Sequence, residues 1–173
     1  MLLFEDETLL REFPPLRACW AARGAQAAVP ITGSNARRTV FGVLNPATGA
    51  RLCRVHPRGG GADFRAFLGA VRGTYRRWDI LMLLDQGSAH TAAASRACAA
   101  ALRIALAFLP TACPELNPLE LLWKAGKQHV SANRAYRDID EQALMFTEHL
   151  SAYTPSETRQ LTGVLSNNFW LPT

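Results

Sequence analysis

The sequence lacks the marks of membrane, secreted and disulfide-bonded proteins. No apolar run reaches the roughly 18 residues that a membrane helix needs. Acidic residues already appear within residues 1–7, and these residues lack the basic start of a signal peptide. The four cysteines form no C-x-x-C pair, which argues against a zinc site and for reduced thiols; they are Cys19, Cys53, Cys98 and Cys113. We therefore expect a cytoplasmic protein with no membrane partner.

Motifs of several enzyme classes are missing as well. There is no P-loop and no G-x-G-x-x-G, and Gly59-Gly60-Gly61 alone is weak evidence for phosphate binding. Ser88 lies in no G-x-S-x-G elbow, so it is a poor candidate nucleophile. A phosphatase with Asp85 as covalent nucleophile would want a second aspartate two residues on, where the chain has Gly87. These absences count against nucleotide-binding, serine-hydrolase and phosphatase functions.

Arginine, in contrast, is abundant and unevenly placed. With 173 residues, 49% of them apolar, the chain is long enough for one globular domain, residues 1–173, and too short for two. The net charge is +5, but residues 17–77 carry eleven arginines and one acid. Arginine pairs bidentately with phosphate, so this segment favours a nucleic-acid partner, although a solvated arginine-rich surface is the alternative. Candidate phosphate contacts, chosen on charge and placement, are Arg37, Arg38, Arg54 and Lys124.

The hydrophobic pattern predicts a chain that starts with strands and then alternates helices with strands. A hairpin is predicted at 45–49, where Asn, Pro and Gly cluster. The strands are expected at 2–6, 17–21, 38–44, 51–56, 80–84 and 104–109, and the helices at 63–75, 91–102, 118–132, 139–152 and 155–165. This order predicts an α/β fold with a mixed sheet flanked by helices. An RNase H-like fold fits it, as do other α/β folds.

Three carboxylates stand where such a fold would expose them. Asp6 ends the first predicted strand, Asp85 ends an apolar strand, and Glu120 opens a helix. Ligands bind at the carboxyl ends of strands in α/β sheets, and phosphoryl transfer with two Mg²⁺ ions needs carboxylates that bridge and flank the metals. Mg²⁺ takes oxygen ligands and keeps several waters, so three acids suffice.

Each of these residues also has a structural interpretation. Asp6 lies among three successive acids, which usually form a solvated surface, and Asp85 could be a turn residue. Asn117 and Glu120 have the spacing of a helix capping box. His90 could orient a water or contact a phosphate, but a structural role near a strand end is equally compatible with its position.

Taken together, the sequence blocks around these residues resemble those of a known protein family. The blocks that carry it are Leu81-Met82-Leu83-Leu84-Asp85-Gln86-Gly87-Ser88-Ala89-His90, Phe108-Leu109-Pro110, and Cys113-Pro114-Glu115-Leu116-Asn117-Pro118-Leu119-Glu120 with Trp123. The chain resembles the mariner superfamily of DDE transposases, and within it the bacterial insertion-sequence branch. Thirty-four residues separate Asp85 from Glu120, a spacing familiar from that superfamily. Phe4-Glu5-Asp6-Glu7 looks like the family's opening segment, and Trp20 followed by Gly24 resembles its next strand.

The resemblance implies an RNase H-like domain that cuts and rejoins DNA. Asp6, Asp85 and Glu120 become the triad that binds two Mg²⁺ or Mn²⁺ ions. Asn117, which fixes the first turn of the helix, becomes a supporting residue, as do His90 and Gln86. The implied partners are DNA (transposon ends and target). The resemblance leaves open a second copy of the chain and a separate helix-turn-helix chain as further partners. The implied location is the bacterial cytoplasm, in association with the nucleoid.

The chain also departs from the family pattern. Gln86 stands where the family usually has Asn, and Cys113 where it usually has Ser. The N-terminal helix-turn-helix modules of the family are expected to be absent, so the chain alone should bind DNA with little sequence preference. The alternative function is a catalytically inactive transposase remnant that binds DNA or a partner protein.

Overall fold

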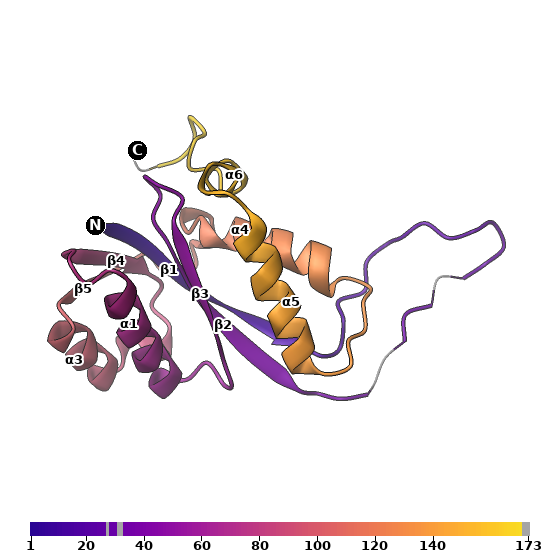
Figure 1. Cartoon of the computed structure of the whole chain (residues 1–173), viewed down its shortest axis with the longest axis horizontal. Helices are drawn as coiled ribbons and strands as arrows, with labels where there is room; N and C mark the ends of the chain where they lie inside the picture. The colour runs from indigo at the N-terminus through magenta and orange to yellow at the C-terminus, as the bar shows by residue number, and fades with distance from the viewer. Residues whose placement is uncertain (27, 31–32, 171–173) are drawn as a thin grey trace.

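The computed structural model describes residues 1–26, 28–30 and 33–170, and a five-stranded sheet lies at its centre (Figure 1). The strand order is β3-β2-β1-β4-β5. The strands are β1 (Leu2–Arg11), β2 (Arg37–Leu44), β3 (Arg51–His56), β4 (Ile80–Leu84) and β5 (Ile104–Phe108). The first three form an antiparallel meander, while β4 and β5 run parallel to β1. The sheet is mixed, as predicted.

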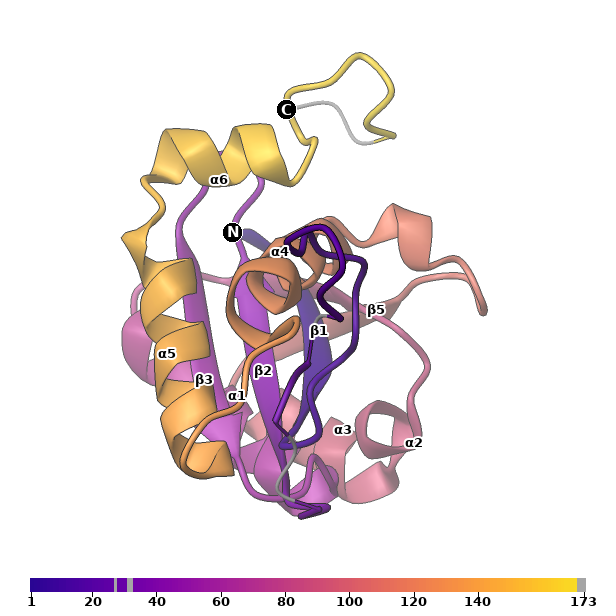
Figure 2. The ribbon, with the colours of Figure 1, turned by 90° about the vertical axis from the view of Figure 1, so that its right-hand side faces the viewer.

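Helices cover both faces of this sheet (Figures 1 and 2). On one face α1 (Gly61–Thr74) and α3 (Ala93–Ala101) enclose a core that includes Phe41, Phe67 and Met82. On the other face α4 (Leu119–Gly126) and α5 (Ile139–Ala152) enclose a second core. The remaining helical elements are α2 (Ser88–Thr91), the 3-10 turn η1 (Pro114–Leu116), the π-helical segment η2 (Lys127–Ser131) and α6 (Pro155–Leu161). Within the described residues, no helix combines the length and apolarity that spanning a bilayer demands.

The central strand β1 distributes its side chains between the two cores. Successive side chains of a strand point to opposite faces, and accordingly Leu3 packs in the α1 core while Phe4 packs in the α4 core. The same alternation directs Asp6 toward α4 and its neighbours Glu5 and Glu7 toward α1. The three successive acids therefore are not one solvated cluster.

Several predicted elements differ from the structure. The strand expected at 17–21 is wrong: these residues form no ladder, and β1 instead continues to Arg11 before Pro14 and Pro15 interrupt it. Trp20, taken as part of that strand, is fully exposed. The helix expected at 91–102 is interrupted at Ala92, whose backbone is extended.

The later helices end earlier than predicted. The helix expected at 118–132 changes from α4 to the π-helical segment at Lys127, and the last helix ends at Leu161, before Gly163 with its positive φ of 71°. The hairpin at 45–49 is present; Asn45 Oδ1 accepts hydrogen bonds from two backbone N–H groups of the turn.

Candidate active site

The three acids singled out from the sequence line one pocket of about 340 Å³. Asp6 lies within β1, Asp85 directly follows β4, and Glu120 lies in the first turn of α4. In the parallel β1–β4 ladder Phe4 pairs with Leu83, so Asp6 and Asp85 each lie two residues beyond that pair. The structure thus brings together three carboxylates from three separate elements, at the edge of the sheet where α/β proteins bind ligands.

A tryptophan and a glycine position Asp6. The indole Nε1 of Trp123 donates a hydrogen bond to Asp6 Oδ2 at 2.9 Å. Across the β1–β2 ladder Asp6 pairs with Gly42, and a Cβ added at Gly42 would lie 2.5 Å from Trp123 Cη2. The indole therefore lies against the strand only because residue 42 has no side chain. Burial, followed by the charges of Glu120 and Glu7, raises the pKa of Asp6 to about 7.

Asp85 is held through one of its two oxygens. Its Oδ1 accepts a hydrogen bond from the backbone N–H of Gly87 at 2.7 Å and lies 2.7 Å from Nδ1 of the buried His90. Gln86 Nε2 donates to the carbonyl of Leu109 at 3.0 Å, so the longer amide ties the end of β4 to the end of β5. Two of the three supporting residues expected from the sequence, His90 and Gln86, thus lie at this edge of the sheet.

Glu120 is not used in a capping box, contrary to that interpretation of its spacing. Helix α4 has Pro118 at its N-cap and no side-chain cap. Asn117 Nδ2 instead donates to the carbonyl of Glu5 at 2.8 Å, and its Oδ1 accepts from the N–H of Leu119 at 3.2 Å. Asn117 thereby anchors the start of α4 to β1. Among the residues that the structure describes, none hydrogen-bonds to the Glu120 carboxylate.

The donor set of this pocket suits divalent cations. Across the described ranges, no Lys or Arg nitrogen lies within 4.0 Å of the carboxylates of Asp6, Asp85 or Glu120. Burial lowers the pKa of Lys127 while the charges of Glu120 and Asp6 raise it, so this lysine lies near both acids without pairing with either. The three acids of this pocket offer carboxylate oxygens, which Mg²⁺ and Mn²⁺ prefer. The residues present thus fit the two ions that the resemblance implies.

A second, larger pocket of about 860 Å³ adjoins the first at Glu120. It is lined by Lys124 and Lys127, which follow Glu120 at helical spacings of four and seven residues, and by Arg17. Two hydrogen bonds of 2.8 Å between Asn133 and the backbone of Arg17 hold the segment after β1 against this groove. Lys127 was missed in the sequence, although it and Lys124 are the chain's two lysines and share a helical face with Glu120.

The arginines chosen as phosphate contacts lie elsewhere. Arg37, Arg38 and Arg54 line neither of these two pockets. Arg38 forms a bidentate pair with Asp140 at 2.7 and 2.8 Å, so its charge is already matched within the chain. Of the four candidates, the structure places only Lys124 beside the triad.

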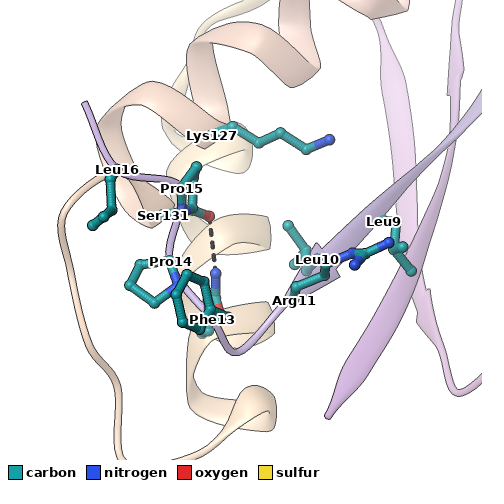
Figure 3. Close-up of a pocket in the computed structure, with 10 residues that line it drawn as sticks. Leu9, Leu10, Arg11, Phe13, Pro14, Pro15, Leu16, Lys127 and Ser131 are labelled. Carbon is teal, nitrogen blue, oxygen red and sulfur yellow. Dashed lines mark hydrogen bonds between the residues drawn. The ribbon is translucent and has the colours of Figure 1, made fainter. Parts of the chain in front are cut away.

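A third cavity is apolar and is not a catalytic site. It has a volume of about 600 Å³ and lies where the chain leaves β1, between Phe13, Pro14 and Pro15 and the segment around Ser131 (Figure 3). No acid lines it. Its walls therefore offer no metal ligands, and the smaller acidic pocket is the candidate active site.

Comparisons with known proteins identify the family and the fold of the chain. Residues 1–142 match the family model described as DDE superfamily endonuclease. The chain is 28% identical over 137 residues to the insertion element IS630 uncharacterized 39 kDa protein of Shigella sonnei, which covers 76% of this chain and 39% of that protein. The chain therefore spans well under half of that relative.

Solved transposase structures share the fold. The Mos1 transposase paired-end complex with left transposon end superposes with a TM-score of 0.72 at 14% identity, over 93% of this chain and 51% of that one. The catalytic domain of Mos1 mariner transposase gives a TM-score of 0.65 at 14% identity, over 93% and 74%. The predicted RNase H-like fold is therefore confirmed. With its family model, its motifs and this fold in agreement, the chain belongs to the DDE superfamily of endonucleases, in the mariner-like group that its sequence resembles.

Proposed function

We propose that the chain is a transposase catalytic domain that cleaves DNA and transfers its strands with two divalent metal ions. The observation that carries the proposal is the meeting of Asp6, Asp85 and Glu120 in one pocket, where, among the described residues, none of them forms an ion pair with Lys or Arg. The family membership supports the endonuclease class. The catalytic roles of the three residues and the count of two ions are part of the proposal.

The triad would hold the two ions, Mg²⁺ or Mn²⁺. When bound, such a pair lowers the pKa of an attacking water or 3′-hydroxyl and stabilises the leaving 3′-oxygen of an in-line displacement. The protein's own contribution is placement. Trp123 fixes Asp6, Gly87 and His90 fix Asp85, and Asn117 fixes the turn that carries Glu120. Rigid placement of this kind is what a catalytic metal site requires.

The groove beside Glu120 would accommodate the DNA strand. Lys124, Lys127 and Arg17 line it next to the triad, so phosphates on both sides of the scissile bond would meet positive charge. Arg37, Arg38 and Arg54 have at most a peripheral role in this scheme.

The proposed partners are transposon ends and target DNA. Structures titled as complexes with transposon ends or strand-transfer products are among the fold's neighbours, and neighbours with Mn and with Mg are among them too. We propose that end recognition requires a helix-turn-helix module on another segment or chain, that two copies pair, and that the protein works in the bacterial cytoplasm at the nucleoid.

Nicking of supercoiled plasmid by the purified chain tests the proposal. We expect nicking that requires Mg²⁺ or Mn²⁺ and disappears in Asp85→Asn and Glu120→Gln. Glu148→Gln, an exposed acid on α5, is the matched control and should retain activity. If the wild type is silent, the assay is repeated with an added helix-turn-helix partner.

The same assay separates the alternative function. DNA binding without cleavage, with the partner present, would support the inactive remnant and contradict the enzyme. Nicking that survives in both triad variants would show that the catalytic residues lie elsewhere.

A further inference from the structure

Behind the triad, on the opposite face of β1, lies a second group of metal-ligating side chains. Glu5 and Glu7 of β1 and His90 of α2 each contribute one ligand atom, and the three atoms lie within 4.8 Å of one another. Glu5 and His90 are fully buried, and the Glu7 side chain is 31% exposed. None of the three belongs to the triad of the proposed function.

The buried atoms of this group lack hydrogen-bond partners. Neither carboxylate oxygen of Glu5 has a partner, and neither do Oε2 of Glu7 and Nε2 of His90. Such groups are rare in folded proteins, since leaving a buried polar atom without a partner is destabilising, and more so when it is charged. The burial of Glu5 accordingly raises its pKa well above the ordinary value. The unpartnered atoms include Glu5 Oε2, Glu7 Oε2 and His90 Nε2, which lie close to one another.

The spacing of the ligand atoms suits a metal better than a hydrogen bond. His90 Nε2 lies 3.2 Å from Glu7 Oε2 and 3.4 Å from Glu5 Oε2. These contacts are longer than ordinary charge-assisted hydrogen bonds, which measure about 2.7–2.9 Å. Ligands bound at about 2.0–2.1 Å in a tetrahedral site are separated by roughly 3.3–3.4 Å.

The far side of the imidazole has the partner that metal-bound histidines use. His90 Nδ1 lies 2.7 Å from Asp85 Oδ1. A histidine that binds metal through one nitrogen almost always donates the other N–H to a carboxylate or carbonyl, which fixes its tautomer. The partly exposed Glu7 offers a route of entry from solvent.

We propose that Glu5, Glu7 and His90 form a third cation site, separate from the catalytic pair, that takes a first-row divalent transition metal such as Zn²⁺. Two carboxylates and an imidazole nitrogen suit such an ion better than Mg²⁺, which prefers oxygen throughout. The ion joins β1 to α2 and fixes His90 as the donor to Asp85 Oδ1. Asp85 then keeps a single orientation, with Oδ2 directed to other ligands.

A proton is the competitor for this position. Burial lowers the pKa of His90, but the close approach of Glu7 and the charges of Glu5 and Glu7 outweigh it and raise the pKa to about 10. Metal binding must displace that proton, so the site would release protons as it fills. Stoichiometric metal uptake would distinguish a bound metal ion from a proton on His90.

The test uses the full chain with the triad disabled by Asp6→Asn and Glu120→Gln, so catalytic ions do not contribute. Calorimetric titration with Zn²⁺ is expected to give one ion per chain, and Co²⁺ to give the intense visible bands of four-coordinate geometry. Adding Glu7→Gln, whose side chain is partly exposed, should weaken Zn²⁺ binding at least tenfold. Adding Glu148→Gln should leave it unchanged.

Glu5→Gln, which keeps the shape of the buried side chain, should weaken binding in the same way. Circular dichroism of each variant confirms that it is folded. No stoichiometric Zn²⁺ uptake, or uptake that Glu7→Gln leaves intact, would overturn the third site and identify the proton as its occupant. Because the triad is disabled throughout, neither result bears on the proposed cleavage activity.

Discussion

Replacing Gly42 with alanine tests how the sheet positions the first triad residue. The new Cβ would lie 2.5 Å from Trp123 Cη2, whereas ordinary contact begins at 3.4 Å, so the indole must move by about 0.9 Å. Trp123 is only 2% exposed and stacks against Phe146, so any movement of the indole disturbs this packing. We expect Gly42→Ala to lower the free energy of unfolding by about 1–3 kcal/mol, the usual cost of overpacking.

The same displacement would break a catalytic contact. A shift of that size away from Asp6 stretches the 2.9 Å hydrogen bond from Trp123 beyond bonding distance. Misplacement by about 1 Å near reacting groups can lower the rate on the order of 100-fold. Urea denaturation measures the stability loss, and metal-dependent plasmid nicking measures the activity loss.

Two further variants make the experiment decisive. Gly69→Ala, on the exposed side of α1 where an added Cβ meets nothing within 4 Å, is the control and should raise stability slightly. Trp123→Phe lacks the clashing Cη2 and Cζ2 atoms, so the double variant Gly42→Ala/Trp123→Phe should be less destabilised than the sum of its single changes, but stay inactive. Wild-type stability and activity in Gly42→Ala would refute this packing argument.

Three other changes have defined outcomes. Lys127→Ala should reduce the slope of log DNA affinity against log salt by about 1, measured by fluorescence anisotropy, whereas Arg38→Ala, whose charge Asp140 already matches, should change it less. In metal-free buffer the folded chain holds a proton on Asp6 up to a pH of about 7, while the unfolded chain releases it near 3.8, so stability should fall as pH rises between these values. Asp6→Asn should reduce that dependence in urea titrations, with the contribution of buried Glu5 remaining, and an unchanged slope would contradict the assignment. Arg51 donates to the carbonyls of Leu150 and Tyr153 and to Thr158 Oγ1, so Arg51→Met should lower the melting temperature through a loss of about 2 kcal/mol, and a loss near zero would show those bonds to be dispensable.

The sequence predicted the strands and helices whose pattern arises from burial. Residues 38–44, 51–56 and 80–84 read as strands because their side chains pack against two cores, and the structure has strands there. The segment 17–21 has similar local composition but no neighbouring strand, and local pattern cannot reveal that a ladder partner is missing. The change from α4 to η2 at Lys127 was not predicted either; η2 contacts α5, and local pattern does not contain such a contact.

The candidate site was predictable as far as its acids. Asp6, Asp85 and Glu120 followed from strand and helix ends together with the motif, and the structure brings them together. Spacing alone could not decide whether Glu120 belongs to the triad or to a helix capping box. The hydrogen bond that decides against the capping box joins Asn117 to Glu5, 112 residues away in the sequence. Glu5 and Glu7 also escaped notice, since their burial depends on which face of β1 they occupy.

Because its side chains alternate between the two faces of the sheet, β1 is intolerant of insertion or deletion. Inserting one residue between Leu2 and Glu5 would shift every later side chain of the strand to the opposite face if its pairing with β4 were kept. Asp6 would then enter the α1 core, and the two glutamates would occupy the face that belongs to the triad. We therefore expect a change in the length of this strand to abolish the site, even though some single substitutions in the strand leave the site intact.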